Sequence, residues 1–349
     1  MSSTGLLSVP PLFYVDRSDR GRLRLTGRDR QSFLQGMVTN DVARLTPGEG
    51  CYALLLDATG HVLADLRVLC LDNALLLDTE PGMASFVAET LERYLIMEKC
   101  RITDISDETI QILVGGFRAV STLEALAVPG IADWAEGANG GLAAGHSEAF
   151  PARVAATRLA SVPTFDVYLD CSDRESLVGA LAAANASILS ESLLESLRIE
   201  AGIPRFGFDM DSRVLAPETG QRNRAINYRK GCYIGQEIVA RIDSRGHTNR
   251  ALTGFVLMPD AVLPSAEVPV EAEGREVGRI TSAAFSPTLG TPIALGYLRH
   301  EFLTPGTAVT IAGSAATVAA LPFVATTGDG ADGDGSPGAP ETAETAVAA

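Results

Sequence analysis

Short apolar runs mark the first part of the chain, with glycines and Asp-Asn pairs between them. Such runs predict β-strands. The predicted strands lie at residues 23–25, 51–56, 61–70, 74–78, 100–105 and 109–114. Residues 29–36 and 81–95 instead have the helical spacing of apolar positions. Strands interspersed with helices predict packed α and β layers in this region.

The second part repeats this style after a stretch rich in glycine and alanine, residues 137–145, which we interpret as a loop or insertion. The predicted strands are residues 152–159 and 165–169, and the predicted helices are residues 174–184 and 191–201. Gly202 and Pro204 follow the second helix, a combination that commonly ends helices.

The third part has little helical periodicity. Short apolar runs at residues 253–258, 268–272, 276–282, 293–298 and 308–311 are separated by glycine and proline turns. This pattern predicts a small β-barrel or sandwich. We therefore divide the chain into residues 1–145 and 146–250, two layered α/β parts, residues 251–325, the barrel, and an acidic tail, residues 326–349, expected to be disordered.

Charge and composition exclude several classes of protein. The net charge of the 349 residues is −15, so general binding to nucleic acid is not expected. No apolar run is long enough to span a membrane and no signal peptide is recognised, so we expect a cytoplasmic protein. The five cysteines and four histidines are scattered, which predicts neither a disulfide framework nor a metal site.

The acidic chain contains one basic stretch. Residues 213–250 hold eight arginines and lysines against three acids, a local charge of +5. Such a stretch is either a solvated face or a pocket for an anionic ligand.

The segment Lys-Gly-Cys-Tyr-Ile-Gly-Gln-Glu, residues 230–237, lies inside this stretch. Neighbouring bases, Arg229 and Lys230, would stabilise a Cys232 thiolate and make it reactive. Gln236 could donate to and accept from the edge of a heterocycle. The alternative is a tight structural junction in which the cysteine is merely packed.

Two carboxylates stand in unusual positions. Glu200 lies in the last turn of a predicted helix, where the helix dipole disfavours negative charge. It either holds a ligand or forms a salt bridge with Arg198 or Arg205. Asp65 interrupts an apolar strand, so its carboxylate is either paired or faces a pocket.

Taken in order, several segments resemble the YgfZ family, relatives of the glycine-cleavage T-protein. They are FLQGMVTNDV at residues 33–42, GHVLADL at 60–66, LRIEAGIPRFGFD at 197–209, PETG at 217–220 and KGCYIGQEIVARI at 230–242. The resemblance covers about residues 12–325. It implies a T-protein-like scaffold, two α/β parts around a central channel plus a C-terminal β-barrel, with tetrahydrofolate or a one-carbon derivative as ligand.

The resemblance also implies roles for residues. Asp65 matches the aspartate that faces the reactive folate nitrogens, and Glu200 matches the glutamate that holds the pterin. Asp78 stands where T-proteins tend to carry asparagine, and Cys232 matches the cysteine typical of YgfZ proteins. Arg241, or another base of residues 222–250, is the candidate partner of the folate carboxylates. Lys230, Tyr233 and Gln236 complete the predicted ligand site, with Cys232 and Asp65 as its reactive groups.

We therefore expect a monomeric folate-binding accessory protein that supports the assembly or repair of iron–sulfur clusters in client enzymes. One alternative is a T-protein-like aminomethyltransferase or demethylase, which Asp65 favours and the cysteine-containing octapeptide disfavours. Another is a binding module that docks client or assembly proteins and holds folate only as a structural element.

Overall fold

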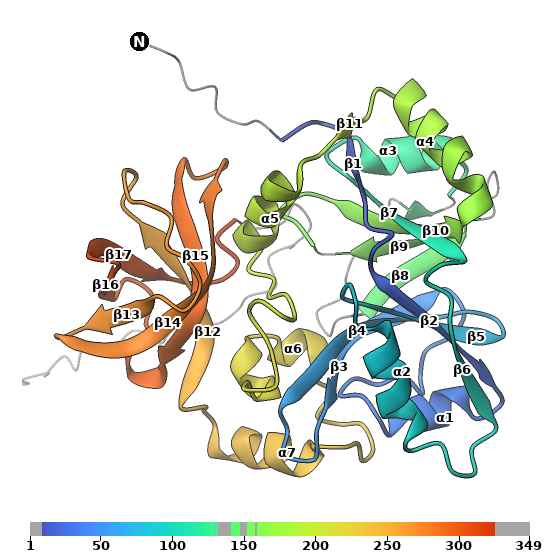
Figure 1. Ribbon diagram of the computed structural model, residues 1–349, viewed down its shortest axis with the longest axis horizontal. Helices are drawn as coiled ribbons and strands as arrows, with labels where there is room; N and C mark the ends of the chain where they lie inside the picture. Colours follow the sequence, from blue (N-terminus) through green and yellow to red (C-terminus); the bar gives the residue numbers. More distant parts are fainter. Residues whose placement is uncertain (1–8, 129, 132–140, 147–151, 158, 325–349) are drawn as a thin grey trace, which may run out of the picture.

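The computed structural model describes residues 9–128, 130–131, 141–146, 152–157 and 159–324. The chain forms an α/β body and a separate barrel (Figure 1). The predicted disordered tail, residues 326–349, lies outside the described residues, as do residues 137–140 of the Gly/Ala-rich stretch.

The body is built on an eleven-stranded sheet in the order β11-β1-β7-β10-β9-β8-β3-β4-β5-β2-β6. Its strands are β1 (Phe13–Asp16), β2 (Gly21–Gly27), β3 (Glu49–Leu56), β4 (Val62–Cys70), β5 (Ala74–Thr79), β6 (Cys100–Asp104), β7 (Thr109–Gly115), β8 (Gly141–His146), β9 (Arg153–Thr157), β10 (Thr164–Asp170) and β11 (Ser187–Ile188). The sheet has two lobes. The strands β2 to β6 make one, and β1, β7, β9, β10 and β11 make the other.

Strand β8 joins the two lobes. Residues 141–145 were expected in a loop, and this prediction is wrong: Ala143 pairs with Glu49 of β3, and Ala144 pairs with Ala155 of β9. The composition of the segment favours a loop, but the backbone groups on the edges of β3 and β9 offer partners on both sides. Hydrogen bonding to two existing edges outweighs a weak intrinsic strand preference.

Helices cover each lobe and close its core. They are α1 (Arg30–Gln35), α2 (Ala84–Glu92), α3 (Ala119–Ala125) and α4 (Arg174–Ala183). The helices α1 and α2 place Phe33, Leu34 and Leu91 in one core with the first lobe, whereas α3 and α4 place Leu123 and Leu181 in a core with the second lobe (Figure 1).

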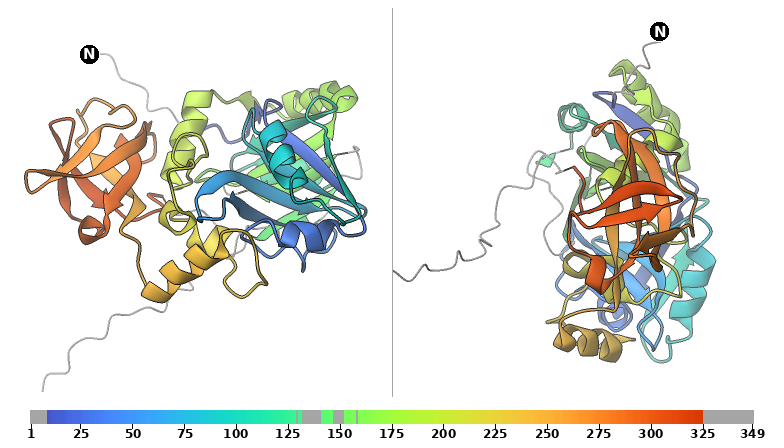
Figure 2. Two further views of the ribbon diagram at one scale, coloured as in Figure 1. Left: turned by 60° about the horizontal axis from the view of Figure 1, so that its bottom comes forward. Right: turned by 90° about the vertical axis from the view of Figure 1, so that its left-hand side faces the viewer.

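The last part is a closed six-stranded barrel, as the turn-rich pattern predicts. Its strands are β12 (Arg250–Leu257), β13 (Pro269–Ala272), β14 (Arg275–Ser286), β15 (Thr291–Arg299), β16 (Ala308–Ile311) and β17 (Ser314–Ala319). Between body and barrel lie α5 (Glu191–Glu200), the short α6 (Arg222–Ala225) and α7 (Gln236–Arg245). Figure 2 shows α5 between the sheet and the barrel, where Ile199 packs with barrel residues such as Ile293.

The predicted scaffold, two α/β parts plus a small C-terminal β-barrel, is therefore confirmed. Among the described residues, every helix is too short or too polar to cross a lipid bilayer.

Candidate functional site

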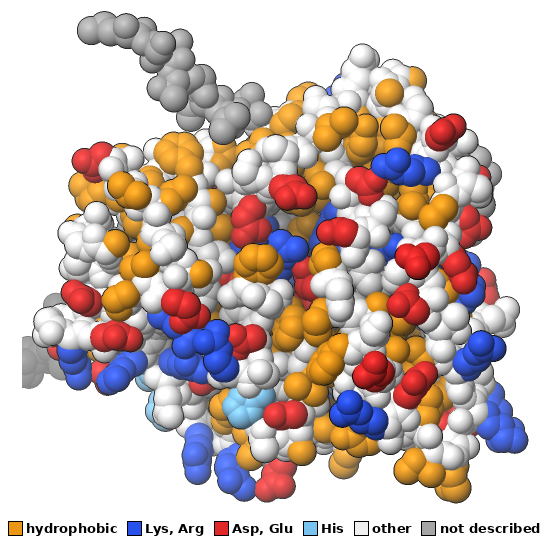
Figure 3. All heavy atoms as spheres, in the orientation of Figure 1, with side chains coloured by type: hydrophobic (Ala, Val, Ile, Leu, Met, Phe, Trp, Pro, Cys, Tyr) orange, Lys and Arg blue, Asp and Glu red, His pale blue; other side chains and the backbone are white. Residues whose placement is uncertain are grey.

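A cavity of about 330 Å³ lies where the two lobes, α5 and the loop after α5 meet. Acidic and basic side chains gather around the hollow near the centre of the molecule in Figure 3. Apolar walls come from Val15, Leu159, Leu194 and Phe208. Cavities of this size, with apolar walls and a few polar groups, are typical of small-molecule sites.

Strand β4 presents Asp65 to this cavity. Its neighbours Ala64 and Leu66 both belong to the core under α1 and α2. Because successive side chains of a strand point to opposite faces, Asp65 faces away from that core, and it lines the cavity. The apolar residues of β4 face the core on one side of the sheet, and Asp65 faces the cavity on the other side.

The Asp65 carboxyl group is only half satisfied. It is 7% exposed, its Oδ2 accepts a hydrogen bond from the Tyr52 hydroxyl at 3.0 Å, and its buried Oδ1 has no hydrogen-bond partner among the described residues. Burial, reinforced by the nearby negative charge of Glu80, raises the pKa of Asp65 to about 6. The group can therefore hold or release a proton near neutral pH.

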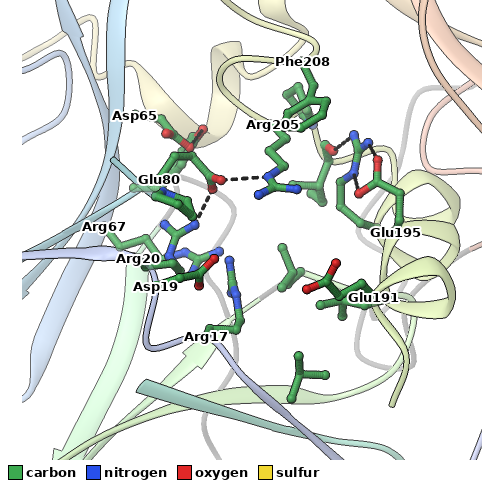
Figure 4. A pocket seen from close by; sticks show the side chains of 18 of the residues that line it. Arg17, Asp19, Arg20, Asp65, Arg67, Glu80, Glu191, Glu195, Arg205 and Phe208 are labelled. Carbon is green, nitrogen blue, oxygen red and sulfur yellow. Dashed lines mark hydrogen bonds and ion pairs between the residues drawn. The ribbon is translucent and has the colours of Figure 1, made fainter. Parts of the chain in front are cut away.

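Seven charged side chains form an alternating chain of ion pairs in and behind the cavity wall. In order, they are Arg205, Glu80, Arg20, Asp78, Arg67, Asp166 and Arg17. We call this set the arginine–carboxylate chain, and Figure 4 shows several of its members. The distances are 2.7 Å from Arg205 Nε to Glu80 Oε2 and 2.6 Å from Arg20 Nε to Asp78 Oδ1. Arg67 lies 2.7 Å from Asp166, and Arg17 lies 3.5 Å from that carboxylate.

Arginines keep the carboxylates of this chain ionised. Burial acts to raise the pKa of Glu80, but Arg20, Arg17 and Arg205 together lower it to about 2. The pKa of Asp78 is also lowered, because Arg20 and Arg67 outweigh its burial. The fixed negative charge on Glu80 adds to the effect of burial, and together they raise the pKa of the neighbouring Asp65.

Asp78 lies behind the cavity wall. It is completely buried, and besides its arginines it accepts hydrogen bonds from Tyr168 Oη at 2.8 Å and from Gln111 Nε2 at 3.0 Å. With both oxygens engaged, Asp78 organises the wall, and the expectation that it contacts a ligand stays a prediction.

Glu200 also lies outside the cavity. Its side chain is fully buried between α5 and the barrel, where it accepts hydrogen bonds from Ser161, Ser286 and both the backbone N–H and the hydroxyl of Thr288. The two bonds from Thr288 are 3.0 Å long. These donors come from the barrel residues Ser286 and Thr288 and from Ser161 of the α/β body, and Glu200 does not line this cavity, so its contact to a ligand stays a prediction.

Lys230 is a structural clamp. Its Nζ donates to the carbonyl oxygens of Gln35, Val38 and Asn40 at 2.6–2.7 Å, and burial lowers its pKa to about 8. All three donors of the ammonium group are used, which ties residues 230–237 to the end of α1. Lys230 does not line this cavity, and its role at a ligand stays a prediction.

The other residues predicted in this segment also lie outside the cavity lining. Tyr233 is buried in a cluster with Tyr52 and Leu54, and its backbone N–H donates to Gln236 Oε1. Cys232 is exposed, and Arg241 pairs with Glu237 at 3.0 Å on the surface of α7. The structure therefore does not bring these residues together with Asp65.

The basic stretch contributes one residue to the cavity, Arg224, whose guanidinium lies 4.3 Å from the centroid of the Tyr52 ring. The charged lining residues that the sequence analysis did not propose for a ligand site include Arg17, Arg20, Arg67, Glu80 and Arg205. The sequence did contain a signal. Four of the five residues 16–20, Asp-Arg-Ser-Asp-Arg, are charged, and they lie at a short connection between two strands, which holds their side chains close to the sheet.

Comparisons with known proteins agree with this architecture. The model of the GCVT N-terminal domain matches residues 12–230, and that of the glycine cleavage T-protein C-terminal barrel domain matches residues 250–325. The chain is 30% identical over 324 residues to an aminomethyltransferase of Streptomyces avermitilis, covering 88% of this chain and 85% of that protein. It is 29% identical over 321 residues to an aminomethyltransferase of Saccharopolyspora erythraea, covering 88% and 85%.

A solved structure shares the fold. The glycine cleavage system aminomethyltransferase T from Bartonella henselae matches with a TM-score of 0.79 and 21% identity, covering 90% of this chain and 87% of that one. Both domain models, together with these relatives, cover nearly all of the described chain. The protein therefore belongs to the glycine-cleavage T-protein (GCVT) family and is related to the aminomethyltransferases.

Proposed function

We propose that this protein binds tetrahydrofolate in the cavity beside Asp65 and supports folate-dependent one-carbon transfer of the aminomethyltransferase kind. The observation that carries the proposal is the buried Asp65 carboxyl group, which faces the cavity with one oxygen lacking a hydrogen-bond partner among the described residues. A buried polar atom without a partner is costly, and such atoms concentrate where a ligand binds.

The lining suits a reduced pteridine. Oδ1 of Asp65 can accept a hydrogen bond from a ring or bridge N–H group, and Leu159, Leu194 and Phe208 offer apolar contacts to the flat parts of the ligand. When bound, tetrahydrofolate supplies the nitrogens that carry a one-carbon unit. The aminomethyltransferase relatives support the same reaction class.

Asp65 is the acid–base group in this proposal. The Tyr52 hydroxyl fixes Oδ2, so that a proton is taken up or released at Oδ1. Burial, together with the negative charge of the ionised Glu80, raises the pKa of Asp65 to about 6. General acid–base catalysis is most effective when the pKa lies near the working pH. The low exposure of Asp65 also keeps bulk water away from this oxygen.

The test combines binding with turnover. Calorimetry should show one tetrahydrofolate bound per chain, and an aminomethyl-lipoyl donor should yield methylenetetrahydrofolate, detected by mass spectrometry. Asp65→Asn should reduce turnover by roughly 10²–10⁴-fold while tetrahydrofolate still binds. The exposed Asp107→Asn is the matched control and should behave as wild type. If Asp65→Asn turns over as fast as Asp107→Asn, Asp65 is not the acid–base group of the reaction.

A second candidate function rests on residues 230–237. The octapeptide that resembles YgfZ proteins places Cys232 on the surface, outside the cavity lining and available to another protein. This supports the role of a folate-dependent accessory factor for iron–sulfur enzymes, in which Cys232 acts at the contact with a client and not on the folate.

Separate variants distinguish the two functions. In a host that lacks its own homologue, Cys232→Ser should fail to restore the activity of iron–sulfur enzymes, while the purified variant binds tetrahydrofolate as tightly as wild type. The exposed Cys171→Ser is the control. Full restoration by Cys232→Ser would argue against the accessory role of the thiol.

A further inference from the structure

A second cavity, of about 320 Å³, lies between the two lobes, and none of its described lining residues also lines the cavity beside Asp65. Its lining includes residues of β2 and β5 in the first lobe, of β9 and β10 in the second, and of the turns that follow β4 and β6. The volume falls in the range of sites that bind small molecules. We call this space the second cavity.

Polar side chains that are already bonded form the wall between the second cavity and the arginine–carboxylate chain. The Tyr168 ring lines the second cavity, while its hydroxyl donates to Asp78 at 2.8 Å. Arg22, which is completely buried, donates to four backbone carbonyl oxygens and to the Thr109 hydroxyl. Because these polar groups are used within the protein, the inner wall offers a ligand mainly apolar contacts.

The apolar part of the lining belongs to a small core. Leu76, Ile105 and Tyr168 are members of this core and are at most 6% exposed, and Leu71 packs against them. A ligand with an apolar body gains by covering these side chains, because both apolar surfaces then leave water. The interior of the second cavity therefore favours a ligand whose inner end is apolar.

Charged groups of both signs lie at the outer part of the second cavity. The first lobe contributes Arg24 and Asp72, and the second contributes Arg153 and Asp170, all of them exposed. Three of the four, Asp72, Arg153 and Asp170, form no ion pair and no side-chain hydrogen bond within the described part of the chain. Arg24 reaches Glu108 only at 3.7 Å. The four groups are therefore available to a bound molecule.

The strand register brings Arg153 and Asp170 to one face of the second lobe. Arg153 lies directly opposite Tyr168 on the neighbouring strand, so both side chains leave the sheet on the same face. Asp170 follows Tyr168 by two positions and lies on that face as well. Diagonal neighbours of this kind are about 7–8 Å apart, which leaves room for a small charged group beside each of them.

A ligand of a single charge is attracted by two of the four groups and repelled by the other two, so its net gain is small. A zwitterion is attracted by both kinds of group at once. We propose that the second cavity binds an apolar α-amino acid, with its side chain against Leu76 and Ile105, its carboxylate at Arg153 and its ammonium group at Asp170. This site is separate from the proposed folate site, because the two cavities have no described lining residue in common.

Calorimetry on the full chain tests this with three probes: L-phenylalanine, 3-phenylpropanoate, which lacks the ammonium group, and 2-phenylethylamine, which lacks the carboxylate. L-Phenylalanine should bind about 10-fold more tightly than either analogue, because each analogue loses one charge-assisted contact. Arg153→Gln should weaken L-phenylalanine by about 10-fold and leave 2-phenylethylamine within about twofold. Asp170→Asn should weaken L-phenylalanine to the same extent and leave 3-phenylpropanoate within about twofold. Both residues are exposed, so both variants should melt like wild type.

The controls replace charges elsewhere in the molecule. Arg44→Gln and Asp260→Asn, both at exposed positions, should bind L-phenylalanine like wild type. Asp65→Asn should do so as well, and a loss there places L-phenylalanine in the cavity beside Asp65 and overturns the inference. Absence of L-phenylalanine binding, equal affinities for the three probes, or an equal loss of all three in Arg153→Gln overturns it too, and each of these results leaves the proposed function standing.

Discussion

Asp65 and Glu200 are both buried carboxylates in segments that resemble one family, yet their surroundings differ. Glu200 accepts hydrogen bonds from three residues at the joint between α5 and the barrel. Asp65 receives one, from Tyr52, and keeps an unpartnered oxygen on the cavity side. A satisfied carboxylate holds two parts of the fold together, whereas a half-satisfied one is available to a ligand.

The comparison predicts its largest effect at Glu200. Glu200→Ala removes the acceptor of several buried donors and leaves a hole at the joint, so the free energy of unfolding should fall by about 3–5 kcal/mol. Urea unfolding measures this. The exposed Glu175→Ala in the first turn of α4 should cost less than about 1 kcal/mol. Equal losses in the two variants would mean that Glu200 is not the anchor described here.

Substitution of Asp65 should change the free energy of unfolding in the opposite direction, that is, stabilise the protein. The native pKa of this carboxyl group is raised from 3.8 to about 6, so the folded protein holds this proton more tightly than the unfolded chain. The resulting stability is present below pH 4 and is lost as the pH rises through 6. Asp65→Asn avoids that loss and should be more stable than wild type by roughly 3 kcal/mol at pH 7–8.

Thermal or urea unfolding across pH 4–8 checks this prediction. The difference between wild type and Asp65→Asn should shrink toward zero as the pH approaches 4. A variant that is less stable than wild type at every pH would show that the ionised carboxylate is itself a structural anchor, like Glu200.

A smaller loss of stability is expected on substitution of Lys230, which lies in the basic stretch that the sequence analysis proposed as a ligand site. Lys230→Met leaves three buried carbonyls without their shared donor and should lower the free energy of unfolding by about 1–3 kcal/mol. Arg241→Ala, which breaks one surface ion pair, should cost at most about 0.5 kcal/mol. If the well-folded Arg241→Ala variant binds tetrahydrofolate more weakly than wild type, then Arg241 on α7 contributes to the ligand site.

Much of the fold was predictable because it depends on local patterns. The apolar run at residues 51–56, the helical spacing at 174–184 and the turn-rich barrel segments all form the expected elements. The exception, β8, consists of small residues whose local preference is weak, and its strand conformation comes from the edges of β3 and β9.

The site was less predictable because its contacts are distant in the sequence. Asp65 was found because a carboxylate in an apolar strand is conspicuous by itself. The partners of Glu200 lie 39 to 88 residues away, and those of Lys230 lie 190 to 195 residues away, so local sequence could not show that both are already satisfied. Likewise, Arg205 and Glu80 form an ion pair although they lie 125 positions apart in the sequence.

The most direct test of the account is a nuclear magnetic resonance titration of protein labelled with ¹³C at the aspartate carboxyl carbons. We predict one resonance that titrates near pH 6, is missing in Asp65→Asn, and changes its midpoint when tetrahydrofolate saturates the protein. A resonance of Asp65 that titrates identically with and without tetrahydrofolate would contradict the central claim that this carboxyl group faces the bound ligand.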